Sequence, residues 1–351
     1  MASIFLTDLN PKQTAELIAG LGVPPYRARQ LQQWVFQRLA FSFDEMSDLP
    51  KNLRQTLSQN IVLHKLMPHK EVISSDGTVK ILFILPDRKT IESTLMPYPA
   101  NGRKTNYTIC LSTQVGCAIG CPFCATGQQG FERHLSPGEI IDQVLFFARR
   151  LRDREPQDKI SNLVFMGMGE PLANYDNLWQ AIEILNAPEG FGLGARNMTV
   201  STAGLIPGIK RLSNEKLQIG LAVSLHASTD KLRDWLVPLN IRYPLTVLIP
   251  ACREYTAKTG RRITFEYILF AGVNDSLVQA RQLAHLVAGL NCHINIIAAN
   301  ITTGDLKPSA PETVAAFEEE LKRLHIQCTV RQGRGLDIDA GCGQLRSRDN
   351  G

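Results

Sequence analysis

Residues 107–127 read YTICLSTQVGCAIGCPFCATG, a short apolar strand pattern followed by a loop that holds three cysteines. Cys117, Cys121 and Cys124 follow the spacing C-x3-C-x2-C. Three thiolates are one ligand short of a closed tetrahedral metal site, and catalytic metal sites differ from structural ones by an open coordination position. The stretch therefore predicts a metal centre with room for another ligand, placed directly after a strand.

An alternation of strand and helix patterns begins at residue 107 and continues to residue 331. Alternating strands and helices indicate a parallel sheet with right-handed crossovers. The pattern gives six βα units and a closing strand, fewer units than a closed barrel has. We therefore expect an α/β fold, a partial open (β/α)6 barrel with its active site at the carboxyl ends of the strands. The strands are expected at 107–112, 161–168, 197–203, 217–227, 261–270, 292–300 and 326–331.

Two of the expected helices begin with a capping sequence. Ser136 precedes a proline, and Glu139 follows three residues after Ser136, which predicts a capping box at the start of a helix over 136–152. Ser309 and Glu312 repeat this spacing. They predict a second capping box, which opens a helix over 310–325.

The chain is expected to divide into four parts. They are a small N-terminal helical domain, a short β extension with a turn at Asp76-Gly77, the barrel, and a C-terminal segment, at 1–65, 66–100, 101–335 and 336–351. The helical part carries basic residues whose face is either solvated or docks a nucleic acid; they include Arg27, Arg29, Arg38, Lys51 and Arg54.

Composition limits the class of protein. The chain has 351 residues, 44% of them hydrophobic and 20% charged, as expected for a soluble globular protein. No apolar run is long enough to span a bilayer, and the first residues lack the pattern of a signal peptide. We therefore expect a cytoplasmic protein whose eight cysteines stay reduced. The net charge of +5 permits a nucleic-acid partner without requiring one.

Polar residues and glycines follow the strands at the points where chemistry is expected. "GMGEP" follows the second strand, and single polar residues end or follow the third, fourth and sixth strands. The carboxyl ends of parallel strands meet at one rim, so these residues are expected to converge there. The candidates are Gly169, Glu170, Ser201, Ser224, Leu225, His226 and Asn300.

The three-cysteine loop has two readings. A structural zinc site needs a fourth ligand, and Cys110 is the nearest further cysteine, but it lies within the expected strand. An iron–sulfur cluster held by three thiolates leaves one iron open to a substrate or cofactor. We favour the cluster, with Cys117, Cys121 and Cys124 as its ligands.

Cys342 lies in a second distinctive stretch, "GLDIDAGCGQLR" at 335–346. Its neighbours are glycines and aspartates, which favours an accessible nucleophilic thiol over a buried structural one. We expect residues 333–346 to be mobile in the absence of a nucleic-acid partner. The other cysteines have apolar neighbours and are expected in the core: Cys252, Cys292 and Cys328.

The cysteine motif after the first strand of a partial barrel resembles the radical S-adenosylmethionine (SAM) superfamily. Together with "FMGMGEPL", "SLHA" and "DIDAGCGQLR", it resembles one subgroup, the RlmN/Cfr family of RNA adenine methyltransferases. The resemblance implies one [4Fe-4S] cluster with three cysteine ligands, and SAM bound at the open iron. It also implies that the seven strand-end candidates above contact SAM and that residues 1–65 bind RNA.

The resemblance implies a specific chemistry for two further thiols and a carboxylate. Two SAM molecules are used per turnover, one to methylate Cys342 and one to generate a radical that takes a hydrogen atom from that methyl group. The carbon then adds to C2 of an adenine, Glu92 removes the C2 proton, and Cys110 releases the RNA through a disulfide with Cys342. These roles match thiol and general-base chemistry.

The substrates implied by the resemblance are 23S ribosomal RNA (23S rRNA) and transfer RNA (tRNA). A low-potential electron donor of the flavodoxin or ferredoxin type is implied as well, with a monomeric protein and no membrane. One alternative is Cfr-type methylation at C8 of the same ribosomal adenine. A more distant alternative is a non-catalytic, metal-stabilised RNA-binding protein. The loop at 301–311 lacks the prolines and aromatic residues of the family's loop there.

Overall fold

The computed structural model describes residues 4–99, 105–154, 158–300 and 306–346. Seven strands of the described chain pair in parallel, in sequence order across the sheet. This confirms the predicted partial (β/α)6 barrel, which ends at β14 on one side. The strands are β6 (Thr105–Cys110), β9 (Lys159–Phe165), β10 (Met198–Thr202), β11 (Gly220–Ser224), β12 (Ile263–Leu269), β13 (Cys292–Ala298) and β14 (Cys328–Arg331).

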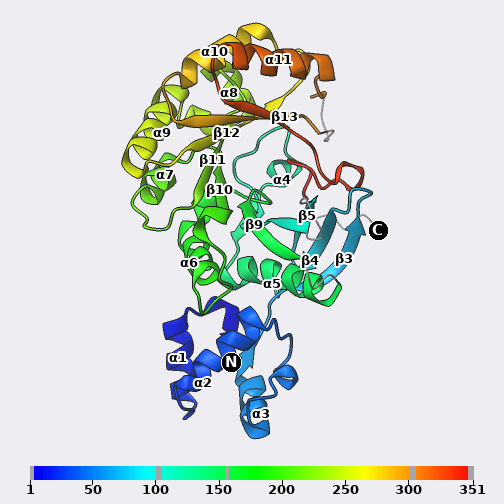
Figure 1. The fold of residues 1–351 in the computed structure, drawn as a ribbon, viewed down its shortest axis with the longest axis vertical. Coiled ribbons are helices and arrows are strands. Elements are labelled where there is room, and N and C mark those ends of the chain that lie inside the picture. Colours follow the sequence, from blue (N-terminus) through cyan, green and yellow to red (C-terminus); the bar gives the residue numbers. More distant parts are fainter. Residues whose placement is uncertain (1–3, 100–104, 155–157, 301–305, 347–351) are drawn as a thin grey trace.

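Helices connect these strands and lie along the outer side of the curved sheet (Figure 1). No helix in the described ranges is both long and apolar enough to cross a membrane. The connecting helices are α5 (Pro137–Arg154), α6 (Tyr175–Asn186), α7 (Ile206–Leu212), α8 (Asp230–Leu236), α9 (Leu245–Thr259), α10 (Leu277–Val287) and α11 (Pro311–Arg323). Short 3-10 turns accompany them at Pro171–Asn174, Ala195–Asn197 and Pro238–Ile241.

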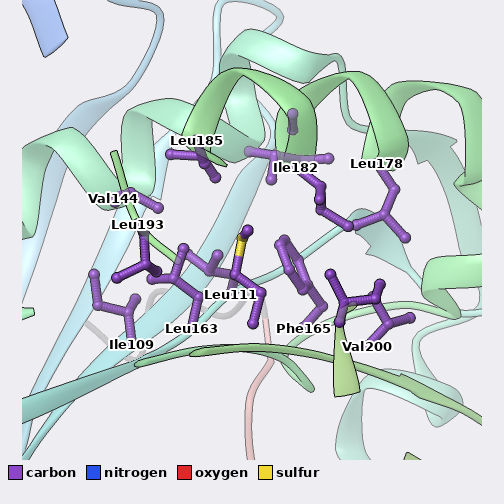
Figure 2. Close-up of a cluster of buried hydrophobic side chains, with 14 of the residues drawn as sticks. Ile109, Leu111, Val144, Leu163, Phe165, Leu178, Ile182, Leu185, Leu193 and Val200 are labelled. Carbon is purple, nitrogen blue, oxygen red and sulfur yellow. The ribbon is translucent and has the colours of Figure 1, made fainter. Parts of the chain in front are cut away.

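The main core lies between the sheet and these helices. Phe165 of β9 and Val200 of β10 are fully buried and face apolar side chains of α5 and α6 (Figure 2). Burial of one such side chain contributes about 1.5–3 kcal/mol. Alternate residues of each strand point to the opposite face, so the same strands also present side chains to the barrel interior.

One of the two predicted capping boxes is confirmed. The backbone N–H of Ser136 donates to Glu139 Oε2 (2.9 Å), and the N–H of Glu139 donates to Ser136 Oγ (3.3 Å). The second prediction was wrong. Helix α11 starts at Pro311, so Ala310 is its N-cap residue, and the Ser309 hydroxyl donates instead to Asp275 Oδ2 (2.8 Å). Ser309 lies one residue too early, and the loop before α10 uses its hydroxyl.

The β extension continues the barrel sheet. Strands β3 (Met67–Ile73), β4 (Val79–Ile84) and β5 (Thr90–Pro99) pair in antiparallel fashion, and β5 pairs with β6. The expected turn at Asp76-Gly77 joins β3 and β4, with Gly77 at a φ of +81°. The sheet thus runs across residues 66–100 and 101–335, whose separation as domains remains a prediction.

The N-terminal lobe, residues 4–65, lies beyond α5, away from the rest of the sheet (Figure 1). It contains α1 (Pro11–Gly20), α2 (Tyr26–Gln32) with a π-helical turn at Gln33–Gln37, and α3 (Lys51–Asn60), together with the short parallel pair β1 (Ile4–Phe5) and β2 (Ile61–Val62). Short 3-10 turns lie at Leu6–Asp8 and Phe43–Glu45. Leu31 and Val35 of this lobe are fully buried.

Hydrogen bonds attach this lobe to α5. Asp8 Oδ1 accepts from the N–H of Gly138 (2.9 Å) in the first turn of α5. His64 Nδ1 lies 3.3 Å from Asp142 Oδ1, and His64 Nε2 lies 3.0 Å from the carbonyl oxygen of Ala40. Both ring nitrogens of His64 therefore face acceptors, which favours the charged imidazolium.

Three of the five basic residues considered for nucleic-acid docking hold parts of the lobe together. Arg38 pairs with Asp48 (3.2 Å) and lies over the Trp34 ring, and Arg54 donates to the carbonyl oxygen of Asp44 (2.8 Å). Arg27 donates to Gln30. These contacts give the arginines a structural use, and the nucleic-acid docking face stays a prediction.

Candidate active site

Two adjoining cavities open at the carboxyl ends of the parallel strands. We call the first the cysteine-loop cavity; its lining includes Cys117, Cys121, Cys124, Gly169, Glu170, Ser201, Ser224, His226, Glu266, Arg331 and Cys342. We call the second the thiol-pair cavity; its lining includes Thr94, Cys110, Cys124, Thr126, Asn300, Arg331 and Cys342. Cys342 therefore lines both. The convergence of strand-end residues predicted from the sequence is found for most of the candidates.

A short hairpin shapes the cysteine loop. Strand β7 (Gln114–Gly116) pairs in antiparallel fashion with β8 (Phe131–His134), and the four-residue helix α4 (Ala125–Gln128) follows the last cysteine of the motif. Gly116 has a φ of +71°, and a Cβ there would lie 1.8 Å from the carbonyl oxygen of Gly130. The Cys117 N–H donates to that same oxygen (2.8 Å). Only glycine lets the two sides of the loop approach this closely.

The three thiols fit an iron–sulfur cluster. Burial raises the pKa of Cys117 to about 12 and raises the pKa values of Cys121 and Cys124, so the loop holds neutral thiols until a cation binds. The described residues contain no group of three or more histidine, cysteine or acidic side chains gathered around a single metal ion. A cluster spreads its ligands over separate irons. Three thiols that line one cavity are the type of donor that such a cluster uses.

Glu170 ties the loop after β9 to the end of β10. Its Oε2 accepts from the N–H of Ala203 (2.7 Å), and its Oε1 accepts from the N–H of Leu172 (3.1 Å). Burial raises the pKa of Glu170 to about 7 against these hydrogen bonds. Gly169 has a φ of +106°, and a Cβ there would lie 2.5 Å from the Cβ of Gln114. The carboxylate thus fixes the loop, and the loop presents its backbone to the cavity.

The end of β11 places His226 in the cysteine-loop cavity. His226 adopts a φ of +57°, and its Nδ1 accepts from the Ile268 N–H (3.1 Å). Its proton therefore sits on Nε2. Burial, followed by the charge of Arg233, lowers the pKa of His226 to about 3, so the ring is neutral. Leu225 does not line either cavity, because its side chain packs in the main core.

Arg233 stabilises the ends of β10 and β11 through hydrogen bonds to backbone carbonyl groups. It is fully buried and donates to the carbonyl oxygens of Leu225 (3.1 Å), Ala203 (2.7 Å) and Ser224 (2.9 Å). These three bonds join the ends of β10 and β11. They keep the rim of the cavity in place without occupying it.

Cys110 and Cys342 meet in the thiol-pair cavity although they lie near opposite ends of the barrel sequence. Cys110 ends β6, and both residues are free, half-buried thiols. Burial, together with the neighbouring Cys342, raises the pKa of Cys110 to about 12, and burial also raises the pKa of Cys342. The charge of Arg331 opposes both shifts. The cavity therefore holds two protonated thiols beside a cation.

The C-terminal segment, residues 333–346, is fastened along its length. Figure 1 shows it beside β3 and β4, and Asp337 accepts from the Ser74 hydroxyl (2.5 Å) and the Ser75 N–H (3.0 Å) at the turn between them. Asn300 Nδ2 donates to the Cys342 carbonyl oxygen (3.0 Å). Further bonds join Ala125 to Gly343, Thr126 to Leu345 and Glu92 to Arg346. These contacts argue against the mobility expected of this segment.

Glu92 lies near the thiol-pair cavity but does not line it. Its Oε1 pairs with Lys80 Nζ (3.3 Å), and its Oε2 accepts from the N–H of Arg346 (2.9 Å). Burial raises the pKa of Glu92, although Lys80 and Arg346 favour its charged form. The C-terminal segment therefore covers this carboxylate in the structure.

Asn300 lines the thiol-pair cavity, whereas most of the other predicted cofactor contacts line the cysteine-loop cavity. Residues 301–305 of the unusual 301–311 loop lie outside the described residues, and Pro308 forms an isolated bridge with Phe270.

Sequence reasoning missed two charged residues that line the cysteine-loop cavity. Glu266 is the single acidic residue within the apolar strand β12, and Arg331 ends β14. A charge inside an apolar strand pattern is a signal that could have identified Glu266. Arg331 follows the same strand-end rule as the other candidates. The three cysteines predicted for the core do lie in it or against it: Cys252, Cys292 and Cys328.

Comparison with known proteins matches both parts of the chain. The model of the ribosomal RNA large subunit methyltransferase N-terminal domain matches residues 4–63, and that of the radical SAM superfamily matches residues 111–284. A protein of Desulfitobacterium hafniense (strain DSM 10664 / DCB-2), named a probable dual-specificity RNA methyltransferase RlmN, is 45% identical over 97% of this chain and 95% of its own length.

Two further relatives have similar coverage. The dual-specificity RNA methyltransferase RlmN 1 of Myxococcus xanthus (strain DK1622) is 46% identical over 98% of this chain and 95% of its own length. The crystal structure of a radical SAM methyltransferase from Sphaerobacter thermophilus superposes with a TM-score of 0.94, at 48% identity. That match covers 98% of this chain and 100% of the other.

Proposed function

The chain belongs to the RlmN family of radical SAM methyltransferases, and from that premise we propose that it methylates C2 of an adenine in 23S rRNA and of an adenine in tRNA. The family implies a [4Fe-4S] cluster and SAM. The observation that carries the proposal is the position of Cys342, which lines both the cysteine-loop cavity and the thiol-pair cavity. A thiol at this position can take part in a reaction in the cysteine-loop cavity and in a reaction with Cys110 in the thiol-pair cavity.

Cys117, Cys121 and Cys124 would hold the cluster and leave one iron for SAM. When bound, the cluster and SAM supply a radical that takes a hydrogen atom from a methyl group. The chain's own contribution is to keep the three thiols in one tight loop and to fix the cavity wall opposite them. Glu170 and Arg233 fix the cavity wall through hydrogen bonds with backbone groups at the strand ends.

Cys342 is the residue that carries the methyl group. Its thiol would lose a proton and gain a methyl group supplied by SAM, and the carbon of that group would be the one transferred to C2. Asn300 holds the Cys342 backbone from the loop after β13. Cys110 lies in the same cavity, where it can form a disulfide with Cys342 as the bond between sulfur and the transferred carbon breaks.

Glu92 is the proposed acceptor of the C2 proton. A carboxylate whose pKa is raised toward neutrality is a better general base at physiological pH than an ordinary one. Its Oε2 is engaged by the Arg346 N–H. For Glu92 to reach the RNA, this end of the C-terminal segment must release it, so RNA binding is expected to displace the contact.

The remaining parts of the proposal concern partners. A low-potential electron donor of the flavodoxin or ferredoxin type would supply the reducing electron, and the N-terminal lobe would contribute to RNA binding. We propose a monomeric enzyme that works in the cytoplasm.

The direct test is to map the methylated carbon. The reconstituted protein is incubated anaerobically with SAM, a reductant and either a 23S rRNA fragment or tRNA, and the nucleosides are then analysed by mass spectrometry. We expect 2-methyladenosine in both RNAs and none with the Cys342→Ala variant. 8-Methyladenosine would instead identify a Cfr-type enzyme, and the absence of any methylated adenine would contradict the proposal.

A further inference from the structure

Glu266 faces the interior of the barrel. On β12, Phe265 and Tyr267 pack into the main core outside the sheet, while Glu266 and Ile268 line the cysteine-loop cavity. Glu266 is only 5% exposed. Alternation along the strand thus places a buried carboxylate among residues that surround the proposed cofactor position.

Only one of the two carboxylate oxygens of Glu266 has a partner. Oε1 accepts from Asn295 Nδ2 on the neighbouring strand (3.1 Å). Oε2 is buried and has no hydrogen-bond partner among the described residues. Buried polar groups are nearly always hydrogen-bonded, because an unused one costs free energy. Oε2 lies in the cavity wall near the charge of Arg331, where it can accept a hydrogen bond from a bound ligand.

The position of Glu266 narrows the choice of ligand. It lines the cysteine-loop cavity and does not line the thiol-pair cavity, so its partner is more consistent with the cofactor than with the RNA. In the register between β11 and β12, Glu266 lies directly beside Ser224. Strands β10 and β11 separate it from the loop after β9, where Glu170 lies. By the family resemblance, the loop with Gly169 and Glu170 contacts the amino group of SAM, so the donor is expected at the nucleoside end of SAM.

We propose that Glu266 Oε2 accepts a hydrogen bond from a ribose hydroxyl of bound SAM, an inference that rests on the proposed function. The two neighbouring hydroxyls of a ribose are neutral donors that suit a carboxylate acceptor. Asn295 holds the other oxygen and so aims Oε2 into the cavity. Glu266 acts as a specificity-determining residue for a cofactor with an intact ribose.

Binding of SAM and of its 2′,3′-dideoxy analogue tests this proposal without measuring turnover. Equilibrium dialysis is carried out with anaerobically reconstituted wild type and with Glu266→Gln, which keeps the side-chain shape. We expect Glu266→Gln to bind SAM about tenfold more weakly. The wild type should lose a similar factor for the dideoxy analogue, whereas Glu266→Gln should bind the two ligands almost equally.

Equal losses for the analogue in both proteins would overturn the proposal, because the carboxylate and the hydroxyls would then act independently. Glu266→Ala, with its iron content and thermal midpoint checked, should show the same insensitivity to the ribose hydroxyls. Glu320→Gln is the matched control, since Glu320 pairs with Arg281 and Arg323 on the outer helices. A wild type that binds neither ligand would overturn the proposed function itself.

Discussion

The cysteine-loop cavity and the thiol-pair cavity are built in opposite ways. The first takes its three thiols, the proposed cluster ligands, from one loop that spans eight residues, closed by glycine and by hydrogen bonds within the same hairpin. The second joins Cys110 at the end of β6 to Cys342 in the C-terminal segment. Its integrity depends on hydrogen bonds between parts of the chain that are far apart in the sequence.

Because of this difference, we expect cluster binding and methyl transfer to respond differently to mutations. A local loop can hold its ligands even when distant contacts are lost, whereas the alignment of the thiol pair depends on the anchors of the C-terminal segment. Mutations in the two regions should therefore be distinguishable by iron content and by the state of Cys342.

The largest effect is expected from Cys117→Ala. Removal of one of three thiolate ligands should lower the iron content from about four per chain to near zero and abolish RNA methylation. Iron analysis after anaerobic reconstitution measures this. Cys292→Ala is the matched control, because Cys292 packs against the core and should leave the iron content unchanged. Full iron retention by Cys117→Ala would remove the basis for the cluster assignment.

The next largest effect is expected from Cys110→Ala. This variant should keep its iron and still methylate Cys342, yet it should stop after one addition to RNA because no thiol can release the product. Denaturing gels should show protein covalently bound to RNA. If iron were lost instead, Cys110 would be a cluster ligand, and the contrast between the two cavities would fail.

A smaller effect is expected from Asn300→Ala. The variant loses the hydrogen bond to the Cys342 carbonyl oxygen, which lies in the loop that presents the thiol. Methylation of Cys342 should fall by about two- to tenfold, while the iron content stays the same. Mass spectrometry of the C-terminal peptide measures the methylated fraction. An unchanged fraction would show that the remaining anchors position Cys342 without Asn300.

The smallest effect concerns the attachment of the N-terminal lobe, far from both cavities. Burial alone would lower the pKa of His64, but the hydrogen bond and charge of Asp142 and the Ala40 carbonyl outweigh it and raise the pKa above 6.5, while Arg149 opposes this. The contribution of His64 to the free energy of unfolding is therefore fully present below pH 6.5. It is lost as the pH rises through the raised pKa that His64 has in the folded protein.

His64→Gln should thus lower the free energy of unfolding by about 1–3 kcal/mol at pH 6, and by less at higher pH. Denaturant titrations of wild type and variant across this range measure the difference. Iron content should be the same in both. A difference that grew with pH would show that His64 is neutral in the folded protein.

The barrel could be predicted because its signals are periodic. Apolar strand patterns recur along the chain, and each strand end carries a polar residue or glycine, so the convergence of Ser201, Ser224 and His226 followed from topology. The capping prediction at Ser309 was wrong because the true N-cap lies one residue later. The Ser309 hydroxyl donates instead to Asp275 in the loop before α10, a contact that the spacing of residues around Ser309 does not predict.

The attachment of the C-terminal segment could not be predicted in the same way. Its glycines and aspartates indicate looseness, yet Asp337 finds its donors at Ser74 and Ser75, in a turn near the other end of the chain. Glu266 was missed for a different reason. Its acidic side chain within an apolar strand was a sequence signal, but only the structure shows that Glu266 lines a cavity and that its Oε2 has no hydrogen-bond partner among the described residues.

The turn between β3 and β4 also bears on how the protein is made. The cysteine loop is synthesised before residues 333–346. Asp337 can therefore contact this turn only after the barrel strands have been made, and Cys342 joins Cys110 at the same stage. The thiol-pair cavity is thus assembled after the cysteine loop.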